Sequence, residues 1–86
     1  SLTRMLALEL APGIRVNAVA PGLILPPEGK DEAYLDRLAE RVPLKRHGSP
    51  RDDVRAVMFL LHSDFVTGQV IFLDGGGSLM SNTYGV

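Results

Sequence analysis

The spacing of apolar residues at the start of the chain predicts a helix followed by a strand. Three leucines recur at every fourth residue, which places them on one face of a helix over residues 1–11. Pro12 and Gly13 end this helix, because proline cannot continue the hydrogen-bond ladder and glycine tolerates the positive φ common after a helix. The run 14–20 is short and rich in β-branched residues, and it predicts a strand covered on both faces.

The middle of the chain predicts a loop and a second helix. Residues 21–30 contain three prolines and two glycines, so they are expected to form a loop with a partly preset backbone. Asp31 is a favoured N-cap for a helix of about three turns that reaches Val42, with apolar residues on one side and charged residues on the other. Pro43 and the residues up to Gly48 end this helix.

The clearest local signal predicts the start of a third helix. Ser49 is a favoured N-cap, and Pro50 fits the first helical position, where no N–H is needed. Asp52 stands where the acid of a capping box returns a bond to the cap. Apolar residues then follow at helical spacing, which predicts a helix to about His62.

The last part of the chain predicts a second strand and a turn. Residues 68–73 include four consecutive large apolar side chains between glycines, which is typical of a fully buried strand. Residues 74–77 are interpreted as a turn rather than a phosphate cradle, because no helix is predicted after them. Residues 78–86 are predicted to be an extended tail.

This order of elements predicts an α/β fold that needs additional strands. Two strands joined by helices should be parallel, with a right-handed crossover. A sheet of two parallel strands leaves both outer edges unpaired, although its side chains expect cover on both faces. We therefore expect residues 1–86 to be the carboxyl-terminal part of one larger α/β domain, incomplete on its own. The remaining strands would come from other sequence, another copy or a complementary fragment.

Composition narrows the classes of function. Hydrophobic residues make up 45% and charged residues 22%, which is ordinary for a globular core. The net charge of −1 is spread along the chain, so neither a nucleic acid nor a membrane is an expected partner. The lack of cysteine excludes disulfides, thiolate catalysis and sulfur-ligated metals. With no long apolar run and no signal-peptide layout, a soluble cytoplasmic protein is expected.

Few side chains are candidates for chemistry. His47 and His62 have no acids at metal-ligand spacing, so no metal site is predicted, and both are expected at the surface or at helix ends. His62, Ser63 and Asp64 contain the letters of a catalytic triad, but sequence neighbours at a helix end rarely point at one another. Asn17 is expected to hold neighbouring backbone rather than to touch a substrate.

Three separated stretches resemble the short-chain dehydrogenase/reductase family. Residues 2–12 are similar to the end of the helix that carries the family's Tyr-x-x-x-Lys, residues 15–22 to strand six with its Pro-Gly loop, and residues 66–76 to the last strand. The resemblance implies a Rossmann-type, doubly wound parallel sheet and hydride transfer from NADPH, with NADH not excluded. The family's phosphate loop and catalytic Tyr and Lys belong upstream of Ser1, so no catalytic residue is carried over and this fragment alone is expected to be inactive.

Within the family, residues 23–29, 42–46 and 65–68 look most like the pteridine reductases and dihydromonapterin reductases. This resemblance implies a pterin substrate. The alternatives are a 3-oxoacyl carrier protein, a sugar or an alcohol as substrate, or a non-catalytic assembly fragment. Lys45 stands where the family usually has Gly, and Pro26 where many members have a Thr that helps hold the cofactor.

The resemblance also implies site residues and partners. The cofactor-side candidates are Pro21, Gly22, Leu23 and Ile24. The candidates for lining the pterin pocket are Leu23, Leu25 and Pro26. Expected partners are the missing amino-terminal part of the domain and further copies in a homotetramer. For Met5 and Leu10, a role at an interface and a role in the core remain equally open.

Overall fold

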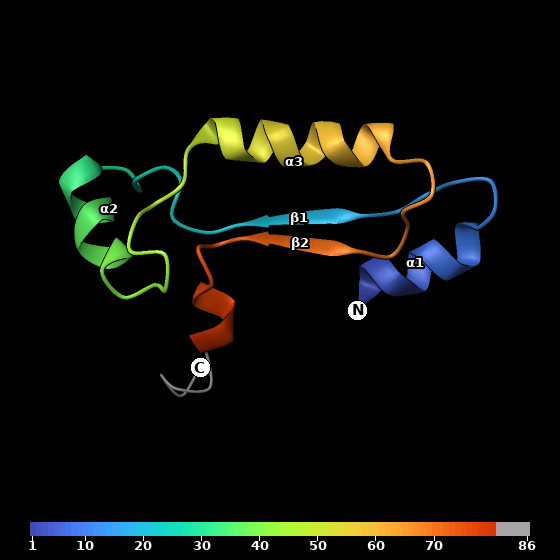
Figure 1. Ribbon diagram of the computed structural model, residues 1–86, viewed down its shortest axis with the longest axis horizontal. Helices are drawn as coiled ribbons and strands as arrows, with labels where there is room; N and C mark the ends of the chain where they lie inside the picture. Colours follow the sequence, from blue (N-terminus) through green and yellow to red (C-terminus); the bar gives the residue numbers. More distant parts are fainter. Residues whose placement is uncertain (81–86) are drawn as a thin grey trace.

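The computed structural model describes residues 1–80, and Figure 1 shows their arrangement. The elements in chain order are α1 (Leu2–Leu10), β1 (Ala18–Pro21), α2 (Glu32–Ala39), α3 (Pro50–His62), β2 (Val70–Leu73) and the 3-10 helix η1 (Gly77–Met80). The predicted order from helix to second strand is confirmed. The prediction of an extended tail is wrong for residues 78–80, which belong to η1, and residues 81–86 lie outside the described part.

The two strands form a parallel pair, as predicted. Ala18 pairs with Val70 and Pro21 with Leu73, so both strands end at the same edge (Figure 1). The first strand is shorter than the predicted run 14–20, because side chains bind the backbone ahead of it: the N–H of Val16 donates to Thr67 Oγ1 at 3.1 Å. In residues 1–80 no third strand joins either outer edge.

Polar caps fix the helix starts close to where the sequence predicts them. The carboxylate of Asp31 accepts the N–H of Tyr34 at 3.1 Å, and Asp52 Oδ2 accepts the N–H of Ser49 at 2.8 Å. α2 ends at Ala39 rather than near Val42. The N–H groups of the residues after it donate to carbonyls three positions earlier, as in turns, instead of four positions earlier, as in an α-helix.

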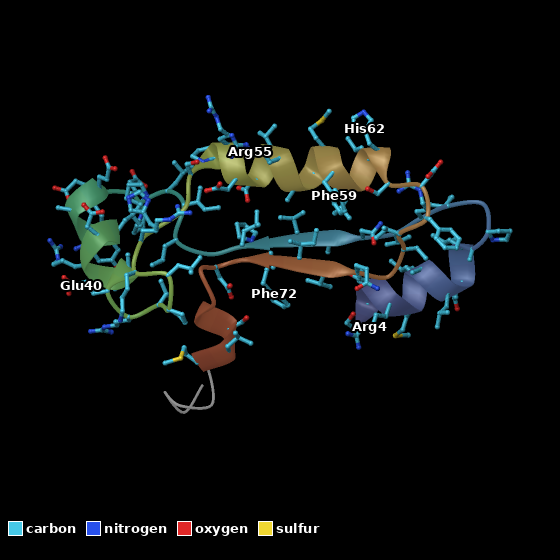
Figure 2. All side chains as sticks on the ribbon, in the orientation of Figure 1. Arg4, Glu40, Arg55, Phe59, His62 and Phe72 are labelled. Carbon is cyan, nitrogen blue, oxygen red and sulfur yellow. The ribbon has the colours of Figure 1, made fainter. Side chains whose placement is uncertain are left out.

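The apolar core of the described residues is small. α3 lies over one face of the sheet, and α1 lies near the amino end of β2 (Figure 1). The buried apolar side chains are Ala7, Ile24, Leu35, Ala39, Ala56 and Leu60. Met5 and Leu10 are 63% and 41% exposed, so neither belongs to the core that residues 1–80 form by themselves. Figure 2 shows Phe72 projecting from β2 away from α3, and this side chain is also largely exposed.

The shape of the chain agrees with a sheet that has room for further elements. The Cα radius of gyration is 15.2 Å, whereas a compact domain of this length would have about 12 Å. A self-contained module would instead close its core and cover its strand edges, and residues 1–80 do neither. No helix in residues 1–80 is long and apolar enough to span a membrane.

Candidate functional site

The Pro-Gly loop leaves the sheet at the carboxyl ends of both strands, where open α/β sheets bind ligands. The N–H of Gly22 continues the strand pairing by donating to the carbonyl of Leu73 at 2.9 Å. A Cβ on Gly22 would lie 2.9 Å from both Cα and Cβ of Asp74, so only glycine allows the loop to lie this close to the turn. The predicted position of this loop is therefore confirmed.

One carbonyl ties the loop beyond Gly22 to the segment that precedes α3, and two backbone donors beside it have no acceptor in the described residues. The carbonyl of Leu23 accepts the N–H of Gly48 at 2.7 Å. The N–H groups of Leu23 and Ile24 donate to no acceptor in residues 1–80. Two unpaired backbone donors thus stand at the carboxyl edge of the sheet.

The predicted site residues have different environments. Leu23 is half-buried and lines a cavity of about 520 Å³ between α3, the segment that precedes it and the turn at Asp74. The side chain of Ile24 is buried, with its Cγ1 close to Gly48. Leu25 is 71% exposed, and neither it nor Pro26 lines this cavity. The structure therefore brings Leu23 to the cavity but leaves Leu25 and Pro26 on a separate part of the loop.

The turn after β2 is held by its own carboxylate. Asp74 Oδ1 accepts the N–H of Gly76 at 3.1 Å, and Oδ2 accepts the N–H of Ser78 at 2.7 Å. Burial raises the pKa of Asp74, but the hydrogen bonds from Ser78 and Gly76 outweigh burial and leave this pKa below its ordinary value. The predicted turn is confirmed, although a short 3-10 helix follows it where none was expected.

His47 has polar neighbours that the sequence analysis missed. Its Nε2 lies 3.4 Å from Glu32 Oε1 and 3.3 Å from Asp36 Oδ1, and its Nδ1 lies 2.7 Å from the carbonyl oxygen of Gly48. The sequence placed His47 at the surface or at a helix end, whereas its side chain is only 20% exposed and lies beside two acids of α2. The available signal was the spacing of Glu32 and Asp36, which puts both on one helix face. The described residues contain no group of side chains that could hold a metal ion.

Two polar side chains hold the amino end of β1. Asn17 donates from Nδ2 to the carbonyl of Val66 and accepts the N–H of Gln69, both at 3.0 Å, so its expected backbone role is confirmed. Arg15 Nη1 donates at 2.9 Å to the carbonyls of Leu60 and Ser63 at the end of α3. No local sequence pattern signals this second contact, because it joins positions far apart in the chain.

Comparison with known proteins adds independent evidence. The family model described as enoyl-(acyl carrier protein) reductase matches residues 1–78. The solved structure of FolM alternative dihydrofolate reductase 1 from Brucella suis, in complex with NADP, is 42% identical with a TM-score of 0.82, and the match covers 91% of this chain and 32% of that one.

Two curated relatives cover the same part of the chain. The dihydromonapterin reductase of Klebsiella pneumoniae is 37% identical, and the match covers 92% of this chain and 33% of that protein. The 3-oxoacyl-(acyl-carrier-protein) reductase of Thermotoga maritima is 45% identical, with 87% and 32% covered. The chain thus spans about a third of the length of the relatives it matches. Sequence, strand pairing and family match agree that the chain belongs to the short-chain dehydrogenase/reductase family.

Proposed function

We propose that this chain is part of an NADPH-dependent oxidoreductase that reduces a pterin by hydride transfer. The observation that carries the proposal is that the N–H groups of Leu23 and Ile24, beyond the carboxyl ends of two parallel strands, donate to no acceptor in residues 1–80. The relative from Brucella suis was solved with NADP, and the relative from Klebsiella pneumoniae is a dihydromonapterin reductase. Both support the choice of cofactor and substrate class.

The residues of the loop fit the nicotinamide end of such a cofactor. A carboxamide oxygen needs donors, and these two N–H groups, which have no acceptor in the described part of the chain, offer them, while Gly22 adds no side chain to obstruct the approach. In the proposed enzyme, Pro21, Gly22, Leu23 and Ile24 lie on the cofactor side, and Leu23, Leu25 and Pro26 border the pterin. The bound NADPH supplies the hydride.

The second candidate is reduction of a 3-oxoacyl group on a carrier protein. The identity of 45% to the reductase from Thermotoga maritima favours it. The two substrates need different binding sites, because a planar pterin presents fixed hydrogen-bonding groups whereas an oxoacyl chain is flexible and apolar. The loop that borders the substrate should therefore discriminate between them.

The test uses hybrids of two complete enzymes. In the pterin hybrid, these 86 residues replace the matching third of the Brucella suis protein. In the oxoacyl hybrid, they replace the matching third of the Thermotoga maritima reductase. NADPH oxidation is followed with dihydrobiopterin and with acetoacetyl-CoA, and each hybrid is compared with its unaltered host.

We expect the pterin hybrid to keep most of the kcat/KM of its host for dihydrobiopterin. The oxoacyl hybrid should lose much of its host's kcat/KM for acetoacetyl-CoA. The reverse pattern would favour the second candidate. If both hybrids are folded but fail to oxidise NADPH with either substrate, the proposed oxidoreductase role is wrong.

Two further parts of the proposal concern the complete enzyme. We expect a homotetramer in the cytoplasm that contains the elements missing here. Its support is the set of exposed apolar side chains on two helices, namely Leu2, Met5 and Leu8 on α1 and Val54, Val57, Met58 and Leu61 on α3. The mass of the pterin hybrid in solution tests the tetramer directly.

A further inference from the structure

The glycine turn after β2, residues 74–77, is packed against the segment that connects α2 to α3, residues 42–48 (Figure 1). A Cβ on Gly76 would lie 2.9 Å from Cγ and 3.1 Å from Cβ of Pro43, which is closer than van der Waals contact allows. The φ of Gly76 is 89°, a conformation that residues with a side chain rarely adopt. Glycine is therefore required here both by its own backbone and by the nearby proline ring.

The ring of Pro43 cannot move aside by itself. It is closed on the backbone nitrogen, so no side-chain rotation carries its Cγ away from Gly76. The next residue, Leu44, donates its N–H to the carbonyl of Gly75 at 3.0 Å, which ties the same two pieces of chain together. A side chain at position 76 must therefore displace the backbone of the segment or of the turn.

The connecting segment and the glycine turn both hold the Pro-Gly loop. At the end of the segment, the N–H of Gly48 donates to the carbonyl of Leu23 at 2.7 Å. At the start of the turn, Asp74 lies so close to Gly22 that a Cβ there would be 2.9 Å from its Cα. The loop is thus fixed between two supports that are themselves in contact.

The path from Pro43 to the loop is short and hydrogen-bonded. Only four residues separate Pro43 from Gly48. Within them, the N–H of Lys45 donates to the carbonyl of Val42 at 3.0 Å, which closes a turn. A displacement of Pro43 should therefore be passed on to Gly48, and from there to Leu23, rather than absorbed by the segment.

We propose that Gly76 is a positioning residue, whose contact with Pro43 sets the place of the connecting segment and thereby of the N–H groups of Leu23 and Ile24. These N–H groups donate to no acceptor in the described part of the chain, and the proposed function assigns them to the nicotinamide carboxamide. The inference rests on that function for its effect on NADPH binding, but not for the contact itself. Gly76 acts through the segment and touches neither cofactor nor substrate.

The first test compares two glycines with similar backbones and different surroundings. Gly76 and Gly68 have φ of 89° and 76°, so alanine is strained at both, but a Cβ on Gly68 would make only an ordinary contact of 3.5 Å with Ala7. In the cofactor-free pterin hybrid, Gly76→Ala should shift the amide resonances of Leu23 and Ile24 in ¹⁵N–¹H spectra. Gly68→Ala is the matched control at the opposite end of β2, and it should leave these resonances unchanged.

The second test measures the binding of NADPH to the same hybrids. Gly76→Ala should raise the Kd of NADPH about threefold to tenfold, the loss expected when one backbone hydrogen bond is weakened, whereas Gly68→Ala should not change it. Pro43→Ala removes the ring carbon that lies closest to position 76. In the double variant Gly76→Ala/Pro43→Ala, both the Kd and the amide resonances of Leu23 and Ile24 should therefore return toward those of the unaltered hybrid.

The two tests separate the possible failures. If Gly76→Ala matches Gly68→Ala in resonances and Kd, or if Pro43→Ala does not restore them, the positioning role is wrong. Should Gly76→Ala fail to fold, the double variant must recover the fold and Pro43→Ala alone must shift the resonance of Leu23, and failure of either overturns the inference. If no hybrid binds NADPH, the proposed function fails, and the cofactor-free spectra still decide whether Gly76 positions the loop.

Discussion

At the scale of single residues, one left-handed backbone position and one carboxylate have opposite effects on local stability. Lys45 adopts a left-handed conformation with φ of 59°, which crowds its Cβ against the backbone. Its ammonium group donates to the carbonyl of Glu40 at 2.8 Å and offsets part of that cost. Asp74 binds two backbone N–H groups of the turn that supports the Pro-Gly loop.

Replacing Lys45 with glycine should leave the protein more stable than replacing it with alanine. Both Lys45→Gly and Lys45→Ala remove the bond to Glu40, but only glycine relieves the left-handed strain. We expect the glycine variant of the pterin hybrid to exceed the alanine variant by about 1 kcal/mol in its free energy of unfolding, measured with urea. Equal stability of the two would show that this backbone carries no strain.

The contribution of Asp74 to stability should depend on pH. Because its pKa is lower in the folded chain than its ordinary value of 3.8, its hydrogen bonds stabilise the fold above that value. This stability is lost as the pH falls through the lowered pKa. The difference in free energy of unfolding between the unaltered hybrid and its Asp74→Asn variant should therefore shrink as the pH is lowered from about 5 to about 2. A constant difference would contradict this account.

Residue-level roles were only partly predictable. The position of Gly22 and the cap at Asp52 follow from local sequence, because their partners are near in the chain or at the end of a strand. The environment of His47 was missed, since it depends on how α2 folds back over the segment before α3. Lys45 was recognised as unusual only through the family resemblance, because a charged residue carries no local signal for a positive φ.

At the scale of elements, both ends of α3 have polar partners. Asp52 binds the N–H of Ser49 at its start, and Arg15 reaches the carbonyls of Leu60 and Ser63 at its end. The start was predictable from the Ser-Pro pattern. The end and the short first strand were not, because their polar partners come from distant segments.

Removing the guanidinium of Arg15 should destabilise the end of α3. Arg15→Ala leaves two helix-end carbonyls without their charged donor, at an expected cost of about 1 kcal/mol. Arg15→Lys is the matched control, because it keeps the charge but cannot present a fork of donors. We expect the lysine variant to fall between the two in urea unfolding of the pterin hybrid. If the lysine variant were as stable as the unaltered hybrid, the paired N–H donors of the guanidinium would not be needed for this contact.

At the scale of the whole molecule, the two strands behave as members of a larger parallel sheet. A cavity of about 450 Å³ lies beside β1 and under α3, lined by residues that include Arg15, Asn17 and Val19. Many large apolar side chains of α1 and α3 are exposed. The need for further strands was predictable from strand count and hydrophobicity, whereas the surfaces that remain open could only be located in the structure.

The most direct test of this central claim is the hydrogen exchange of a single amide in the pterin hybrid. The N–H of Ala18 donates to Gln69 across the β1–β2 pair, so the next N–H along the strand, on Val19, points to the opposite edge. We predict that the N–H of Val19 is protected as strongly as that of Ala18, because a neighbouring strand of the complete sheet accepts it. Rapid exchange at Val19 beside a protected Ala18 would show that this edge is free and would contradict the account.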